Sequence, residues 1–186
     1  NASTRVFVIV EGIYSMDGSI LNLPEIILLK KKYDFFLIVD EAHSFGVLGK
    51  KGRGVHEHFG IPANEVDIWT SSLSKAIPSN GGFIAGSREL IILLQHQSSP
   101  YVFSTALNLG SVAAIIKSID VIERSNGRIE NLWENTNYFL RACRELGFNM
   151  GLSESPVTPV IVGGRKETLN LSAYLYEHQI LSPAAV

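Results

Sequence analysis

Cysteine and excess charge of either sign are both scarce in this sequence. Cys143 is the single cysteine among 186 residues, which excludes an internal disulfide and leaves the redox compartment open. The chain carries 16 Lys and Arg against 18 Asp and Glu, which gives a formal net charge of −2. It therefore lacks the basic surplus that nucleic acid or an anionic membrane attracts, and we predict neither as a partner.

Long hydrophobic runs are missing as well. The longest stretch without Asp, Glu, Lys or Arg runs from Leu90 to Ile116, and the polar sequence QHQSSP at 95–100 interrupts it. We therefore predict no membrane segment, because a spanning helix needs about 20 consecutive apolar residues. The hydrophobic share of 46% is typical of a globular protein. Since the chain starts at Asn1 and a strand-like run begins within five residues, we expect an excerpt that is truncated at both ends.

Short apolar runs alternate with helical patterns in the first part of the chain. Residues 6–10 and 35–39 are continuous apolar runs, which are typical of strands buried on both faces of a parallel sheet. Residues 24–33 predict a helix between them, with Pro24 in the first turn and three lysines near its end. This order predicts a βαβ unit of an α/β protein. Further strands are predicted at 67–72, 82–85 and 159–162, and further helices at 87–97, 108–124, 129–146 and 166–179.

The pattern becomes helix-rich near residue 110. Apolar residues at 129–146 recur at steps of three and four, which places them on one face of a long helix. We predict that this face is buried and that Trp133, Phe139, Leu140 and Cys143 belong to the core.

An acid and a histidine follow the second predicted strand. Asp40 and His43 stand three residues apart in the sequence DEAH, where ligands of open parallel sheets bind. A capping Asp and a surface His are an equally good interpretation of the spacing alone. The same four letters occur in helicases, in which the first acid holds magnesium beside a nucleotide. However, the sequence contains no phosphate loop of the GxxxxGK[ST] type.

Lys75 is a second candidate for chemistry. It ends the sequence TSSLSK at 70–75, just past a predicted strand, and NGG follows at 80–82. A lysine among hydroxyl residues and glycines on a tight turn is a candidate Schiff-base lysine. Taken alone, a solvated loop lysine is the commoner interpretation. His56 and His58 lack a third ligand at zinc spacing and are predicted to be surface residues.

Five ordered blocks together resemble the α-oxoamine synthases, a family of pyridoxal-phosphate (PLP) enzymes. The blocks are EGIYSMDG at 11–18, VDEAHSFG at 39–46 with GRG at 52–54, SLSKA at 72–76, GGFI at 81–84 and PYVFST at 100–105. They cover about residues 5 to 110 in family order, and this order is far more specific than either short motif alone. The family includes aminooxononanoate synthase, aminoketobutyrate ligase, aminolevulinate synthase and serine palmitoyltransferase.

The resemblance implies an α/β fold-type I transferase with a mostly parallel sheet in the large domain. It places 1–110 in part of the large cofactor-binding domain. Residues 111–186 then form bridging helices and the start of a small α+β C-terminal domain. It further implies a cytoplasmic homodimer that condenses an amino acid with an acyl-CoA or acyl-carrier thioester, usually with loss of CO2. Another fold-type I enzyme such as an aminotransferase, or a non-catalytic partner subunit, remains an alternative.

The resemblance also implies roles for single residues. Lys75 matches the lysine that binds PLP covalently, Asp40 the acid that pairs with the ring nitrogen, and His43 the histidine near the phenolic oxygen. Four hydroxyl residues match further cofactor contacts. These are Ser15 near the phenolic oxygen, Ser72 near the phosphate, and Ser104 and Thr105, which reach the phosphate of the neighbouring subunit.

The sequence departs from the family pattern directly after the lysine. Where the family has an aromatic residue or Leu followed by Gly, this chain has IPSN at 77–80. Proline fixes φ and removes an amide donor, so we expect the loop beyond Lys75 to differ. The family's phosphate loop and ring-stacking residue are expected before residue 1, and its carboxylate-binding arginine after Val186.

Overall fold

A computed structural model describes residues 4–124 and 127–185. Its centre is a four-stranded sheet in the order β1 (Phe7–Glu11), β2 (Phe36–Asp40), β3 (Ile68–Ser72) and β4 (Gly82–Gly86). The first three strands are parallel and β4 pairs with β3 in the antiparallel direction. The predicted α/β class and the mostly parallel sheet are therefore confirmed.

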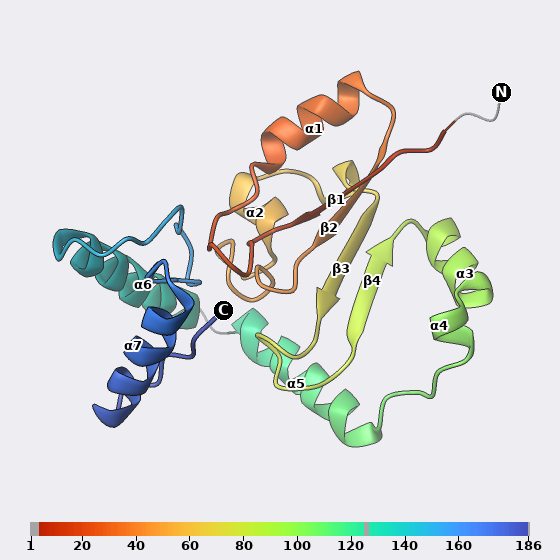
Figure 1. The fold of residues 1–186 in the computed structure, drawn as a ribbon. Helices are drawn as coiled ribbons and strands as arrows, with labels where there is room; N and C mark the ends of the chain where they lie inside the picture. Colours follow the sequence, from red (N-terminus) through yellow and green to blue (C-terminus); the bar gives the residue numbers. More distant parts are fainter. Residues whose placement is uncertain (1–3, 125–126, 186) are drawn as a thin grey trace.

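Helices α1 (Leu23–Lys32) and α2 (Val55–Phe59) pack on one face of this sheet (Figure 1). The Asn22 side chain accepts a hydrogen bond from the amide of Glu25 at 3.4 Å and so caps α1. At the other end, Lys30 forms an ion pair of 2.8 Å with Asp67. The side chains of Leu23 and Ile27 are buried against the sheet.

The core lies between these helices and the sheet, so among the described residues only one sheet face is covered by packed helices. Along β2, Leu37 and Val39 are fully buried, whereas Phe36 on the opposite face is 45% exposed. On β1, Phe7 and Ile9 are likewise exposed. The prediction that residues 6–10 and 35–39 are buried on both faces is therefore wrong for the described residues, because α1 and α2 cover one face alone.

Helices dominate after β4, as the sequence predicted. The elements are α3 (Arg88–Gln97), α4 (Ser99–Val102), α5 (Leu109–Arg124), α6 (Arg128–Glu145) and α7 (Arg165–Glu177), and a 3-10 helix, η1 (Ala63–Glu65), precedes β3. Ser87 caps α3 as its position suggests, because its hydroxyl accepts from the amide of Leu90 at 3.2 Å. Helix α5 crosses the end of the sheet at which β3 stops. Helices α6 and α7 lie together to one side of the sheet, at the left of the view (Figure 1). Across the described ranges, no helix combines the length and apolar character needed to cross a membrane.

Helix α6 buries less of its apolar stripe than the sequence predicted. Leu140 and Cys143 form a small core with Met150, and the Trp133 indole donates a hydrogen bond to the carbonyl of Val47 at 3.0 Å. Phe139, however, is 44% exposed, so its assignment to the core is wrong for the described residues. The burial is narrow because α6 packs against two separate groups of residues rather than a continuous layer.

The strand predicted at 159–162 is absent from the part of the chain that the structure describes. These residues have no regular secondary structure, and the amide of Ile161 donates one backbone hydrogen bond, to the carbonyl of Asn149 at 2.8 Å. A β-branched run becomes a strand only when a neighbouring strand completes its ladder, and none of the described segments lies in register beside it.

Candidate functional site

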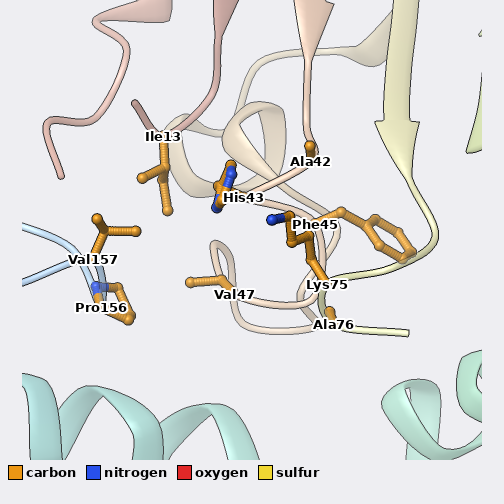
Figure 2. Close-up of a pocket in the computed structure, with 9 residues that line it drawn as sticks. All are labelled: Ile13, Ala42, His43, Phe45, Val47, Lys75, Ala76, Pro156 and Val157. Atoms are coloured by element: carbon orange, nitrogen blue, oxygen red, sulfur yellow. The ribbon is translucent and has the colours of Figure 1, made fainter. Parts of the chain in front are cut away.

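A cavity of about 210 Å³ lies beyond the carboxyl ends of the parallel strands. The Lys75 amine and the His43 imidazole both project into it, and the amine points toward the imidazole (Figure 2). The remaining lining is mainly apolar and consists of Ile13, Ala42, Phe45, Val47, Ala76, Pro156 and Val157. The cavity thus combines a primary amine with an imidazole in an apolar setting.

Lys75 sits on a loop that is held at both sides. The amide of Leu73 donates to the carbonyl of Gly81 at 2.9 Å, and the amide of Ser79 donates to the carbonyl of Leu73 at 3.1 Å. Leu73 and Ile77 are buried on either side of the lysine, while Lys75 itself is exposed. The loop therefore fixes the backbone around the lysine and leaves its amine accessible.

His43 and Asp40 occupy the turn that follows β2. Asp40 is the last residue of the strand, and its Oδ1 accepts from the amide of Ala42 at 2.8 Å. This bond orients the carboxylate at the carboxyl edge of the sheet, near the cavity that His43 lines. Asp40 and His43 are therefore presented by one short turn, although the Asp40 carboxylate does not line the cavity.

The predicted hydroxyl contacts are placed apart from the cavity lining. Ser72 ends β3, and its hydroxyl lies 2.7 Å from that of Ser74, one residue before the lysine. Ser15 is exposed in the loop after β1, where its amide donates to a carboxylate oxygen of Glu11 at 3.3 Å. These positions leave the assigned roles of Ser15 and Ser72 as predictions.

Ser104 and Thr105 lie in the exposed connection between α4 and α5 and do not line the cavity. The Ser104 hydroxyl donates to the carbonyl of Tyr101 at 3.4 Å. Tyr101 and Phe103 on the same segment are 62% and 86% exposed. The segment is thus open to contact from outside the described chain.

The unusual loop at 77–80 packs against the first turn of α5. The hydroxyl of Ser111 donates to the side-chain oxygen of Asn80 at 2.9 Å, and the hydroxyl of Ser79 reaches the carbonyl of Ser111 at 3.4 Å. The polar residues that replace the family pattern therefore anchor this loop on α5, at the far side of the loop from Lys75.

The wall formed by Pro156 and Val157 was not predicted from the sequence. It is brought to the cavity by Glu154, whose carboxylate accepts from the amide of Ile20 at 3.2 Å and whose own amide donates to the carbonyl of Gly18 at 3.2 Å. About 80 residues separate this wall from Lys75, and no local pattern signals such a contact.

Glu41 was also missed, although it stands between Asp40 and Ala42 in the DEAH sequence. Its side chain is 3% exposed, and burial raises the pKa of its carboxyl to about 7. Hydrogen bonds from the Ser44 hydroxyl and the Val55 amide favour the charged form and oppose this rise, and the nearby Asp40 charge adds to it. The sequence did offer a signal for its burial. Every second residue of a strand points to the same face, and Glu41 follows the buried Leu37 and Val39 at this spacing.

Metal ligands do not gather within residues 4–124 and 127–185, where no group of three or more His, Cys, Asp or Glu side chains could hold an ion. His58 is exposed, as predicted, and meets the Phe59 ring edge to face, whereas His56 is half-buried against Trp69 rather than fully on the surface. The chemistry available at the cavity is therefore that of an amine, an imidazole and a neighbouring carboxylate.

Comparison with known proteins gives a consistent result. The chain is 46% identical over 178 residues to an 8-amino-7-oxononanoate synthase of Symbiobacterium thermophilum. It is 40% identical over 180 residues to a serine palmitoyltransferase of Bacteroides thetaiotaomicron. These alignments cover 96% and 97% of this chain and 45% of each relative, so the chain spans about half the length of the curated relatives it matches.

A solved structure shares the fold as well. Serine palmitoyltransferase from S. paucimobilis, bound to a PLP–myriocin aldimine, superposes with a TM-score of 0.90 at 26% identity, over 98% of this chain and 48% of that one. The family model described as aminotransferase class I and II matches residues 1–184. The chain therefore belongs to the aminotransferase class I and II family and, within it, to the α-oxoamine synthases.

Proposed function

We propose that the protein containing these residues is a PLP-dependent synthase that joins an amino acid to an acyl-CoA or acyl-carrier thioester. The amino acid loses its Cα proton, Cα bonds to the thioester carbonyl carbon, and the carbon–sulfur bond breaks as the thiol leaves with a proton. Loss of the carboxyl group as CO2 is then balanced by a proton added at Cα. The observation that carries the proposal is the Lys75 amine facing the His43 imidazole at the carboxyl edge of the sheet (Figure 2).

The residues present fit this cofactor. An aldehyde cofactor needs an accessible primary amine, and Lys75 supplies one on a loop whose backbone is fixed. A pyridine nitrogen that stays protonated needs a carboxylate, and Asp40 offers one that is already oriented by the Ala42 amide. When bound, PLP supplies an electron sink for the bonds at Cα of the amino acid.

Each residue then has a defined task. Lys75 holds the cofactor covalently through Nζ, and the same amine, once free, accepts and returns the proton at Cα. The Asp40 carboxylate keeps the proton on the ring nitrogen by charge and hydrogen bonding. His43 orients the ring by donating a hydrogen bond to its phenolic oxygen. The apolar wall of Pro156 and Val157 excludes water on the side opposite the lysine.

The homodimer belongs to the same proposal. Tyr101, Phe103 and Leu109 expose large apolar side chains next to Ser104 and Thr105, and aromatic enrichment without charge marks the centre of interfaces. A second copy covers this surface and receives both hydroxyls at its cofactor phosphate, while Ser15 and Ser72 serve the site of their own chain. We also propose that residues 1–110 belong to the large cofactor-binding domain and residues 111–186 to bridging helices and the small C-terminal domain. The location proposed for the protein is the cytoplasm.

The test uses the full-length protein with added PLP. Binding at Lys75 gives a new absorption band near the visible edge, and borohydride reduction followed by peptide mapping places the pyridoxyl group on Lys75. Thiol release from acyl-CoA that depends on a small amino acid identifies the synthase. A label on Lys50 or Lys51 contradicts the lysine assignment, and amine transfer to a keto acid without thiol release identifies an aminotransferase instead.

A further inference from the structure

The carboxylate of Glu41 lies at the meeting point of three loops. Its Oε2 accepts from the hydroxyl of Ser44, and the amide of Val55 donates to Oε1 at 2.9 Å and to Oε2 at 3.2 Å. The side chain is 3% exposed and does not line the cavity, although its neighbours Ala42 and His43 do. The Glu41 carboxylate therefore links the turn after β2 to the start of α2, and it does so outside the cavity.

The backbone of Glu41 strengthens the same junction. Its amide donates to the carbonyl of Thr70 on β3 at 2.7 Å, which extends the sheet ladder by one residue. Its carbonyl accepts from the amides of Ser44 at 3.1 Å and Phe45 at 2.8 Å. The backbone of Glu41 thus joins the turn carrying His43 to β3 and closes the first part of that turn.

Two glycines make room for this carboxylate. A side chain at Gly12 would collide with the Ser44 hydroxyl and with Glu41. At Gly54, where φ is +101°, a side chain would run into the Glu41 carboxyl group. The structure around these two positions is therefore shaped to hold a buried acid, and the short Gly-Arg-Gly turn is one side of that enclosure.

From this geometry we propose that Glu41 is a positioning residue, which holds the turn bearing Asp40 and His43 in place by accepting from Ser44 and Val55. The proposal rests on the proposed function, since the two groups that it positions are those assigned to the PLP ring. Glu41 does not line the cavity, so it would act through its neighbours Asp40 and His43. A buried acceptor with two donors is stiff, because moving it leaves buried donors unpaired.

The experiment compares Glu41→Gln with Glu57→Gln in the full-length protein with PLP. Glu57 is a matched control, since its carboxylate accepts from the amides of Lys51 at 3.1 Å and Arg53 at 3.0 Å on the other side of the Gly-Arg-Gly turn. It makes no contact with the Asp40–His43 turn among the hydrogen bonds of the described residues. Ser44→Ala is the third variant and removes one bond to Glu41 while leaving the acid in place.

Two readouts separate positioning from general stability. The circular dichroism of the cofactor band reports how the ring is held. Separate values of kcat and KM show whether a variant affects the catalysed step or substrate binding. We expect Glu41→Gln to reduce the cofactor signal and to lower kcat by about 10- to 100-fold with less change in KM, because small misplacements of reacting groups are costly. Ser44→Ala should change both readouts in the same direction by less, and Glu57→Gln should leave both at the wild-type value.

The outcomes distinguish the two proposals. If wild-type protein gives no cofactor band and no label on Lys75, the proposed function fails. If wild-type protein binds PLP and Glu41→Gln matches Glu57→Gln in both readouts, the positioning role is wrong and the function stands. If Glu41→Gln does not fold, Ser44→Ala decides, and a wild-type cofactor signal and kcat in that variant overturn the positioning role.

Discussion

The raised pKa of Glu41 makes folding stability depend on pH in a defined direction. Burial moves the pKa of this carboxyl from 4.5 to about 7 in the folded state. The folded protein therefore binds this proton more tightly than the unfolded chain between these values. The contribution is fully present below about pH 4.5 and is lost as the pH rises to about 7. A shift of this size corresponds to about 3 kcal/mol of unfolding free energy.

Urea unfolding of the full-length protein at pH 5 and pH 8 measures this effect, with Glu41→Gln as reference. Glutamine fills the same space and stays neutral at both values, so titration of the other groups cancels in the difference. We expect the unfolding free energy of wild-type protein, relative to Glu41→Gln, to fall by about 2.5 kcal/mol between the two conditions, slightly less than the full effect because pH 5 lies above the unfolded pKa.

A wild-type to Glu41→Gln difference that is equal at pH 5 and pH 8 would refute the reasoning. It would mean that the Ser44 and Val55 donors compensate the loss of solvation completely. A difference that grows with pH would show that they overcompensate, so that the carboxylate is stabilised in its charged form.

Three further predictions concern the site, the interface and the core of the full-length protein. Asp40→Asn should retain PLP on Lys75, as shown by borohydride labelling, and lose most turnover; near-normal exchange of the amino-acid Cα proton would contradict the role of Asp40. Phe103→Asp should shift sedimentation from dimer to monomer, because Phe103 is 86% exposed on the proposed interface, and an unchanged dimer would remove this segment from the interface. Leu37→Ala should lower the unfolding free energy by about 2–5 kcal/mol in urea, since the side chain is fully buried; a loss below about 1 kcal/mol would contradict its place in the core.

Elements with local signals could be predicted from the sequence. The helix expected at 24–33 is α1 (Leu23–Lys32), because an early proline and three terminal lysines both lie within the segment itself. The four strands of the sheet were placed within one residue at their ends, with Gly and polar residues as boundaries. The turn positions of Lys75 and His43 followed from the same boundaries, since each residue comes just after a strand.

Features that depend on distant partners could not be predicted in this way. Whether residues 159–162 form a strand depends on a neighbouring strand, and a β-branched run carries no information about one. The exposure of Phe139 depends on what packs against α6 rather than on its place in the helical stripe. The contact of Val157 with the cavity depends on Glu154 and the loop after β1, a pairing across more than 130 residues.

The two adjacent acids of the DEAH sequence show how backbone geometry divides tasks between neighbours. Successive residues of a strand point to opposite faces, and the bond from Glu41 to Thr70 continues the ladder past Asp40. Glu41 therefore follows Leu37 and Val39 onto the helix-covered side, where it meets Val55, while Asp40 stays on the other side. Gly12 falls opposite Glu41 because Glu11 pairs with Asp40, which explains why a residue without a side chain is needed there. The strand register thus directs Asp40 to the side proposed for the cofactor and Glu41 to the opposite side, where it holds the turn that carries His43.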